Sequence, residues 1–124
     1  DYNDPFGHLE GDKILVRIGR IIKTCLRKMD TAYRYGGEEF TIILPGTPGE
    51  EAKTVAERLR AAVAAEDFTG KGNGGPRITI SIGVTQYCRE EPISNFVQRA
   101  DQAMYQSKQS GRNKVSCIFM NPAE

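Results

Sequence analysis

The segment of the chain with the clearest chemical potential is residues 36–40, which read GGEEF. Glycine has no side chain, so backbone amides at such a place can come close to a phosphate or a ribose. Carboxylate oxygens are preferred ligands of hard cations, and a cation held there can stabilise charge on reacting phosphate oxygens. The segment therefore indicates a site for a metal-bound nucleotide. Taken alone, it equally suits an ordinary hairpin turn with a charged edge, because short motifs recur by chance.

Apolar residues that recur every three or four positions predict three helices around this segment. The first covers about residues 10–27 and turns an isoleucine-rich stripe away from most of its arginines and lysines. The third lies between Pro92, which suits a first helical turn, and Gly111, which is a natural helix stop. The expected buried face of the third helix comprises Phe96, Val97, Ala100, Ala103 and Met104.

The second helix has the clearest start signal in the sequence. Thr47 is expected to be its N-cap, with Pro48 at the first helical position and Glu50 three residues after Thr47, which is a capping-box arrangement. The apolar residues that follow at helical spacing should face the core. They are Ala52, Val55, Ala56, Leu59 and Val63.

Four segments outside the helices are predicted as strands. Residues 29–35 and 39–44 flank the two glycines and should form a β-hairpin. Residues 77–84 alternate isoleucine with polar residues, and residues 115–119 also alternate. The resulting order α, ββ, α, β, α, β suits an α+β fold with a mostly antiparallel central sheet flanked by helices, of the ferredoxin-like or nucleotide-cyclase palm kind.

Only a short polar stretch precedes the first helix, although a helix at that place in such a sheet normally follows a strand. We therefore expect that a first strand is missing and that the 124 residues are part of a longer domain. Unpaired strand edges and exposed apolar helix faces would cost several kcal/mol, out of the roughly 5–15 kcal/mol that stabilise a domain.

Composition and charge exclude several classes of protein. The chain is 39% hydrophobic and 27% charged, as is usual for one soluble domain, and its formal net charge of +1 gives no reason to expect non-specific binding to nucleic acid or anionic lipid. No stretch approaches the about 18 apolar residues of a membrane span, and no targeting segment is visible. The three cysteines, Cys25, Cys88 and Cys117, have unrelated spacings and indicate reduced thiols with no zinc site.

Together with its neighbours, the GGEEF segment resembles the signature of the GGDEF family of diguanylate cyclases. Several spaced motifs in one order are more specific than any of them alone. The matching residues are Asn3-Asp4, Gly7-His8, Gly11-Asp12, Arg34-Tyr35-Gly36-Gly37-Glu38-Glu39-Phe40, Ile80-Ser81-Ile82-Gly83-Val84, Arg99-Ala100-Asp101, Tyr105, Lys108 and Gly111-Arg112-Asn113. The resemblance implies one domain over residues 1–124, from a cytoplasmic bacterial signalling protein, that condenses two GTP into cyclic di-GMP and two pyrophosphates.

The same resemblance implies roles for the residues of the GGEEF segment. Glu38 matches the acid that holds Mg²⁺ (or Mn²⁺) beside the attacking 3′-hydroxyl, where a metal would stabilise charge during phosphoryl transfer. Glu39 is expected to support catalysis differently, because adjacent strand residues face opposite sides. Gly36 and Gly37 would accommodate the phosphates and the ribose. His8 is expected to be structural rather than a general base.

Four further residues match the family's substrate-binding positions. Asn3 and Asp12 match a pair that reads the guanine edge, which would select GTP over ATP. Lys108 and Arg112 match basic residues that reach the triphosphate, and their spacing places them on one side of a helix that persists that far. Without the resemblance, Asp12 would be interpreted as an acid at a helix start, and the two cations as stabilisers of a helix end.

A second site is indicated by Arg27 and Asp30, an RxxD motif six residues before Gly36. In the family, this motif at this spacing is a product-inhibition site, where the arginine and the aspartate bind cyclic di-GMP. Arg58 matches a secondary arginine that can join the bound product. The alternative for Arg27 and Asp30 is a solvated helix end.

One departure from the family keeps a second function open. The family's first strand carries another metal-binding aspartate and a Phe-Lys pair shortly before the position of Asn3, and the chain starts after them. The expected function is a cyclase that works as a homodimer, because two bound GTP must face each other. The alternative is a catalytically inactive domain that acts as a receptor for GTP or cyclic di-GMP. Scattered aromatics without a basic stripe argue against a nucleic-acid-binding module, and no direct membrane contact is expected.

Overall fold

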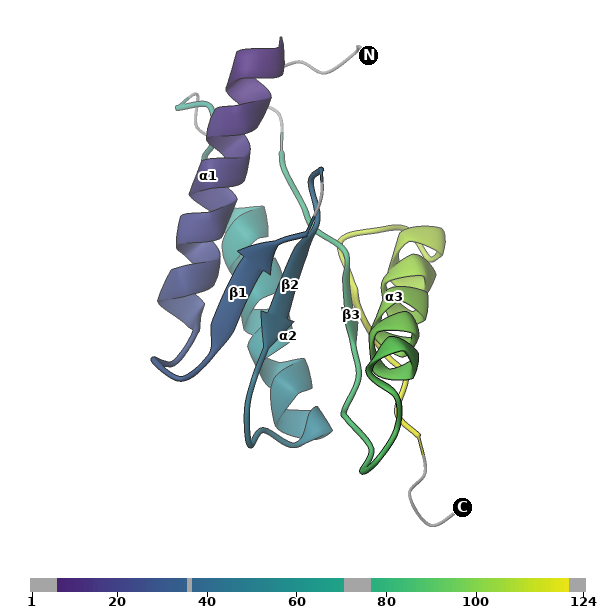
Figure 1. Ribbon diagram of the computed structural model, residues 1–124. Coiled ribbons are helices and arrows are strands. Elements are labelled where there is room, and N and C mark those ends of the chain that lie inside the picture. The colour runs from purple at the N-terminus through teal and green to yellow at the C-terminus, as the bar shows by residue number, and fades with distance from the viewer. Residues whose placement is uncertain (1–6, 36, 71–76, 121–124) are drawn as a thin grey trace.

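The computed structural model describes residues 7–35, 37–70 and 77–120, which form the α+β fold expected from the sequence (Figure 1). The predicted order of helices and strands is confirmed, and no strand precedes the first helix within the described ranges. None of the helices in these ranges is long and apolar enough to span a membrane. The elements are α1 (Gly7–Cys25), β1 (Thr31–Arg34), β2 (Phe40–Ile43), α2 (Gly49–Ala65), β3 (Ile82–Val84), α3 (Ile93–Gln109) and β4 (Val115–Cys117).

The strands pair in two ladders of different kinds. β1 and β2 form the expected antiparallel hairpin, with Thr31 opposite Ile43 and Arg34 opposite Phe40. β3 and β4 are parallel, with Ile82 opposite Val115, because α3 connects them as a crossover helix. The third strand is shorter than predicted, since only its last three residues have a ladder partner.

Helix α2 is central to the apolar core. Its Leu59 and Val63 pack against Ile18 and Ile22 of α1, and all four side chains are buried. Ala52 and Ala56, one to two turns closer to the start of α2, pack with Val84 of β3 in a second cluster. Figure 1 accordingly shows α2 behind the hairpin, beside α1, and α3 on the side of β3. Helix α2 thus links α1 to the β3–β4 ladder, and the hairpin packs against the shared α1–α2 cluster through Ala32, Phe40 and Ile42.

Two sequence predictions about the helices are wrong. The N-cap of α2 is Pro48 rather than Thr47, and no side chain caps the helix, because the Thr47 hydroxyl bonds to groups outside it. In α3, Val97 was expected in the buried face but its exposed fraction is 51%, whereas Arg99 and Ser107 are buried. The apolar pattern missed this face because Arg99 and Ser107 are polar, and each is buried with hydrogen-bond partners outside α3.

Helix α3 lies directly on β3 at Gly83. A β-carbon there would collide with the backbone of Ala100, Ala103 and Met104. Ser107, which is fully buried, bonds across the same contact by donating to the carbonyl of Ile82 at 2.8 Å. The missing side chain at position 83 is thus a condition for the packing of α3.

We expect Gly83→Ala to destabilise the domain by roughly 2–3 kcal/mol, because the collision is with backbone that cannot rotate away. Gly19→Ala is the matched control, since its β-carbon would lie 3.8 Å from the Phe40 ring, an ordinary contact. That control should be neutral or stabilising by roughly 0.5–1 kcal/mol, because alanine favours a helix. Urea unfolding followed by circular dichroism measures both changes. Equal midpoints for the two variants would contradict the expectation.

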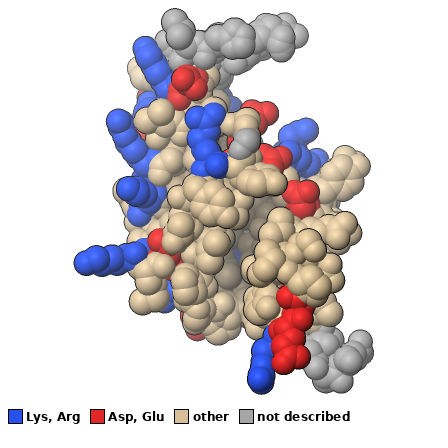
Figure 2. All heavy atoms as spheres, viewed as in Figure 1, with Lys and Arg blue, Asp and Glu red and all other residues tan. Residues whose placement is uncertain are grey.

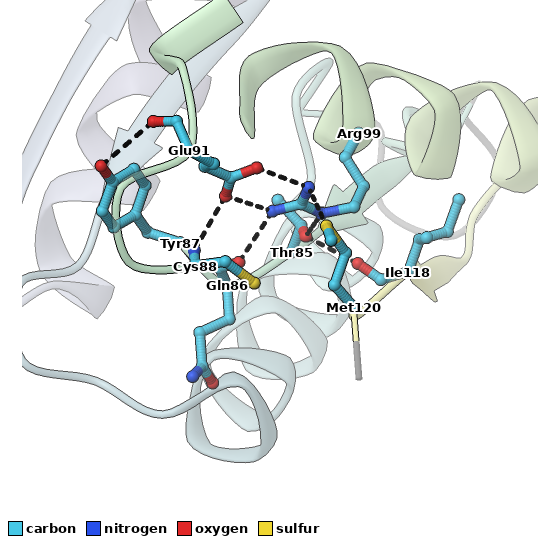
Figure 3. A network of polar contacts seen from close by, with 8 residues as sticks. All are labelled: Thr85, Gln86, Tyr87, Cys88, Glu91, Arg99, Ile118 and Met120. Atoms are coloured by element: carbon cyan, nitrogen blue, oxygen red, sulfur yellow. Dashed lines mark hydrogen bonds and ion pairs between the residues drawn. The ribbon is translucent and has the colours of Figure 1, made fainter. Parts of the chain in front are cut away.

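Arg99, a buried arginine in the second turn of α3, holds the loop after β3 (Figure 3). The Arg99 guanidinium donates to both carboxylate oxygens of Glu91, at 2.9 and 2.7 Å. Its remaining donors reach the Thr85 hydroxyl at 2.6 Å, the Gln86 carbonyl at 2.9 Å and the Met120 sulfur at 3.1 Å. Every N–H direction of the guanidinium is therefore used, which is the condition for burying such a charge without a large penalty.

The carboxylate of Glu91 should make the stability of the domain depend on pH. The hydrogen bonds from Arg99, helped by the backbone amide of Cys88, lower the pKa of Glu91 from 4.5 to about 2. The folded state thus binds fewer protons than the unfolded state, and this stabilisation is complete above pH 4.5 and lost as the pH falls toward 2. Glu91→Gln should flatten the dependence of unfolding free energy on pH within that window. Glu90→Gln, at the exposed neighbour, should leave it as in the parent, and urea titrations at several pH values distinguish the two.

Candidate nucleotide site at the hairpin tip

The GGEEF segment forms the tip of the β1–β2 hairpin. The amide of Tyr35 donates to the carbonyl of Glu39 at 2.7 Å and closes the turn. Gly37 has a φ of +53°, in the left-handed region that favours glycine. Glu38 is exposed at this turn, whereas Glu39 is half-buried, in keeping with the different environments expected for them. Gly36 lies outside the described residues.

A side chain that the sequence did not single out holds this tip. Arg34, at the end of β1, donates from Nη2 to the carbonyl of Gly37 at 2.7 Å. The bond joins the residue before the turn to the middle of the turn, and so restricts the backbone next to Glu38. The motif contained Arg34, but a contact from a side chain to a backbone carbonyl three residues on has no signature in a sequence pattern.

Two other predicted parts of the site lie at the same end of the strands as the tip. In Figure 1 the N-terminal half of α1 and the connection from α3 to β4 both lie at this end. Asp12 lies in the N-terminal half of α1. Lys108 lies at the end of α3, and Arg112 lies in the connection from α3 to β4. The fold therefore brings three segments toward one end, while Asn3 lies outside the described residues.

Asp12 occupies the second turn of α1, since the helix begins at Gly7. A favourable effect on the helix dipole is confined to the first turn, so this alternative role for Asp12 is weakened. Asp12 is exposed and borders an open depression of about 340 Å³ whose other lining residues are Lys13, Val16, Arg17 and Arg20.

The basic side chains of this depression belong to a cationic edge of the molecule. Figure 2 shows lysine and arginine side chains gathered along the α1 side. Arg17 is already committed there, because it pairs with Glu66, donates to the carbonyl of Phe68 and lies 5.1 Å from the centre of the Phe68 ring. The depression thus offers positive charge next to Asp12.

Lys108 and Arg112 are near each other in sequence but do not share a helical face. The helix ends at Gln109, and the amide of Arg112 donates to the carbonyl of Ser107 at 2.9 Å. Arg112 and Asn113 have φ values of 63° and 50°, in the left-handed region that residues other than glycine rarely adopt. Such backbone is often found at functional sites. A shared helical side was expected only for a helix that persists to Arg112, and that condition is not met, because the chain turns sharply after Gln109.

The two residues of the RxxD motif bond to each other. The backbone amide of Arg27 donates to Asp30 Oδ2 at 2.8 Å, and its Nη2 donates to Asp30 Oδ1 at 3.0 Å. Hydrogen bonds from the Arg27 side chain lower the pKa of the Asp30 carboxyl. Arg58 is exposed on α2, and no hydrogen bond or ion pair among the described residues joins it to this pair.

The tip offers the exposed carboxylate of Glu38 for a metal ion. The described residues contain no group of three histidine, cysteine, aspartate or glutamate side chains that could hold a metal. Glu38 is exposed, and no hydrogen bond among the described residues engages its carboxylate. Because Mg²⁺ commonly binds one or two carboxylates together with substrate phosphates, an exposed carboxylate at a glycine turn fits a metal brought with a nucleotide.

Comparisons with known proteins agree with this geometry. The family model described as "Diguanylate cyclase, GGDEF domain" matches residues 1–114. The chain therefore belongs to the GGDEF family of diguanylate cyclases. It is 46% identical over 115 residues to diguanylate cyclase A of Treponema denticola, covering 92% of this chain and 31% of that protein. It is 42% identical over 113 residues to diguanylate cyclase DgcM of Escherichia coli, covering 91% of this chain and 27% of that protein.

Solved structures show the same fold. The GGDEF domain of DgcB from Caulobacter crescentus, in complex with c-di-GMP and with its coiled coil, has a TM-score of 0.85 at 30% identity, over 94% of this chain and 62% of that chain. The active GGEEF domain of a diguanylate cyclase from Vibrio cholerae has a TM-score of 0.82 at 30% identity, over 96% of this chain and 75% of that chain. The chain spans about a third or less of the two curated relatives named above.

We expect Arg34→Met to loosen the hairpin tip, because it removes the donor to the Gly37 carbonyl. Hydrogen exchange at the Tyr35 amide should become roughly threefold to tenfold faster, as the loss of one hydrogen bond implies. Arg77→Met is the matched control, since Arg77 is also an exposed arginine that donates to one backbone carbonyl, that of Ala64. Unchanged exchange at Tyr35 in the Arg34 variant would show that the bond does not restrain the tip.

Proposed function

We propose that residues 1–124 form the catalytic domain of a cytoplasmic bacterial diguanylate cyclase, which condenses two GTP into cyclic di-GMP and two pyrophosphates. The observation that carries this proposal is the GGEEF turn, where an available Glu38 carboxylate lies beside a glycine in the left-handed region. Family membership supports the reaction, because the named relatives are diguanylate cyclases.

The residues of the tip and the surrounding segments divide the work of binding and catalysis. Glu38 holds Mg²⁺ (or Mn²⁺), which when bound supplies positive charge to the reacting oxygens. Gly36 and Gly37 leave room for the phosphates and the ribose, and Glu39 supports the turn from its half-buried position. Arg34 restrains the backbone of the turn, so that the carboxylate of Glu38 is presented in one direction.

Substrate recognition comes from the other segments at the same end of the domain. Asp12, with Asn3, accepts and donates hydrogen bonds at the guanine edge, a pattern that adenine does not match. Lys108 and Arg112 neutralise the triphosphate from the end of α3 and from the turn after it. Two such domains face each other in a homodimer, so that each 3′-hydroxyl attacks the α-phosphate of the other GTP.

The RxxD pair is the proposed site of product inhibition. Arg27 and Asp30 lie next to each other at the end of α1, on the segment that leads into β1, the first strand of the hairpin. An arginine and an aspartate at one place can bind the phosphates and the guanine edge of cyclic di-GMP. The related DgcB domain has been solved in complex with c-di-GMP, which supports a product-binding role for a domain of this fold. Arg58 would join such a ligand from α2.

The decisive test is turnover of GTP with Mg²⁺ by the full-length protein and its Glu38→Ala variant. We expect the variant to lose about 100-fold or more in rate, as when one preorganised charge-stabilising group is removed. Glu50→Ala, at an exposed acid in the first turn of α2, should keep the parent's rate. Chromatography of cyclic di-GMP and a pyrophosphate assay measure the product. Full activity of the Glu38 variant would refute the assignment, and a folded parent that binds cyclic di-GMP without turning over GTP would indicate the receptor function instead.

A further inference from the structure

The carboxylate of Asp30 is covered by its own partner in the RxxD motif. Its Oδ2 accepts from the backbone amide and from Nε of Arg27, at 2.8 and 3.3 Å, and its Oδ1 accepts from Nη2 at 3.0 Å. The exposed fraction of the Asp30 side chain is only 3%, whereas that of Arg27 is 53%. The guanidinium therefore lies over the carboxylate on the side open to solvent.

This arrangement conflicts with binding of a guanine edge. A guanine N–H group can donate to Asp30 only if a carboxylate oxygen is accessible, and at present both oxygens accept bonds from Arg27. The guanidinium must move aside before a ligand reaches the carboxylate. The pair as described is thus a closed arrangement, and ligand binding needs an open one.

Thr47 stabilises the closed arrangement from a different part of the chain. Arg27 Nη2 donates to the Thr47 hydroxyl at 2.7 Å, the shortest of its bonds, and also reaches the Pro45 carbonyl at 3.0 Å. The hydroxyl in turn bonds to the Pro45 carbonyl at 3.2 Å. Thr47 immediately precedes the Pro48 N-cap of α2, so its backbone is anchored to a packed helix. This is also why Thr47 does not cap α2 itself.

We propose that Thr47 sets the affinity of the RxxD site for cyclic di-GMP by holding Arg27 in the closed arrangement. This inference rests on the proposed product-inhibition site. A ligand that binds only the open arrangement has an apparent affinity lowered by the fraction of molecules that are closed. Removing the Thr47 acceptor weakens the closed arrangement without touching either residue of the motif. Loss of the hydrogen bond between Arg27 and Thr47 should therefore tighten the binding of cyclic di-GMP.

The test is calorimetric titration of the full-length protein with cyclic di-GMP. Thr47→Val has the same shape but no hydroxyl, and we expect its dissociation constant to be roughly threefold to tenfold lower than that of the parent, the equivalent of one hydrogen bond. Thr47→Ser keeps the acceptor and should bind like the parent. Thr54→Val is the matched control, because the Thr54 hydroxyl on α2 bonds only within the helix, to the Glu50 carbonyl. Circular dichroism establishes that each variant is folded.

The Arg27→Ala variant distinguishes a failure of the proposed inhibitory site from a failure of the proposed role of Thr47. Loss of binding in this variant, with tighter binding in Thr47→Val, supports both the inhibitory site and the role of Thr47. If Arg27→Ala loses binding but Thr47→Val binds equally or more weakly, Thr47 does not hold a competing arrangement and the inference is overturned, while the inhibitory site remains. If the parent does not bind, or Arg27→Ala binds like the parent, the inhibitory site itself fails and the inference falls with it.

Discussion

The packing of α2 is the interaction on which the rest of the structure depends. One end of its apolar face packs with α1 through Leu59 and Val63, and the other packs with β3 through Ala52 and Ala56. The two ladders are separate two-stranded sheets, so α2 is the element that contacts both α1 and the β3–β4 pair. A small pair of strands is marginal by itself, and helix packing supplies most of the apolar burial that stabilises it. The position of the hairpin tip therefore depends on the packing of this core.

Three arginines then hold the loops that the core does not reach. Arg34 bonds to the turn of the hairpin, Arg27 bonds to the segment before α2, and Arg99 bonds to the loop after β3. Arg27 and Arg99 donate to side chains as well as to backbone carbonyls, because a guanidinium has five donors in a planar fork, whereas Arg34 donates to the Gly37 carbonyl. The two exposed arginines lie at segments with proposed roles in catalysis and regulation, whereas buried Arg99 is paired with Glu91 and serves the fold.

The sequence predicted the kind and order of the elements well, because periodic apolar patterns report which faces are buried. It was less informative in two cases: where a polar side chain had two possible partners, and where a helix ends. Thr47 matched a helix cap, but tertiary structure places its hydroxyl within reach of Arg27, which offers a charged donor. Lys108 and Arg112 matched one helical face, but the helix ends at Gln109 and the chain enters the left-handed region. The spacing of two residues along the chain does not show at which residue a helix ends and a turn begins.

By itself the sequence determined the α+β order, the hairpin and the presence of adjacent glycines and acids at its tip. These features depend on neighbouring residues and on local backbone freedom, so they can be recognised without the fold. Only the tertiary structure decided that β3 and β4 are parallel, that Arg34 holds the tip and that Arg27 covers Asp30 with help from Thr47. Those features join residues whose distance in space depends on how helices and turns pack, which no pattern along the chain encodes.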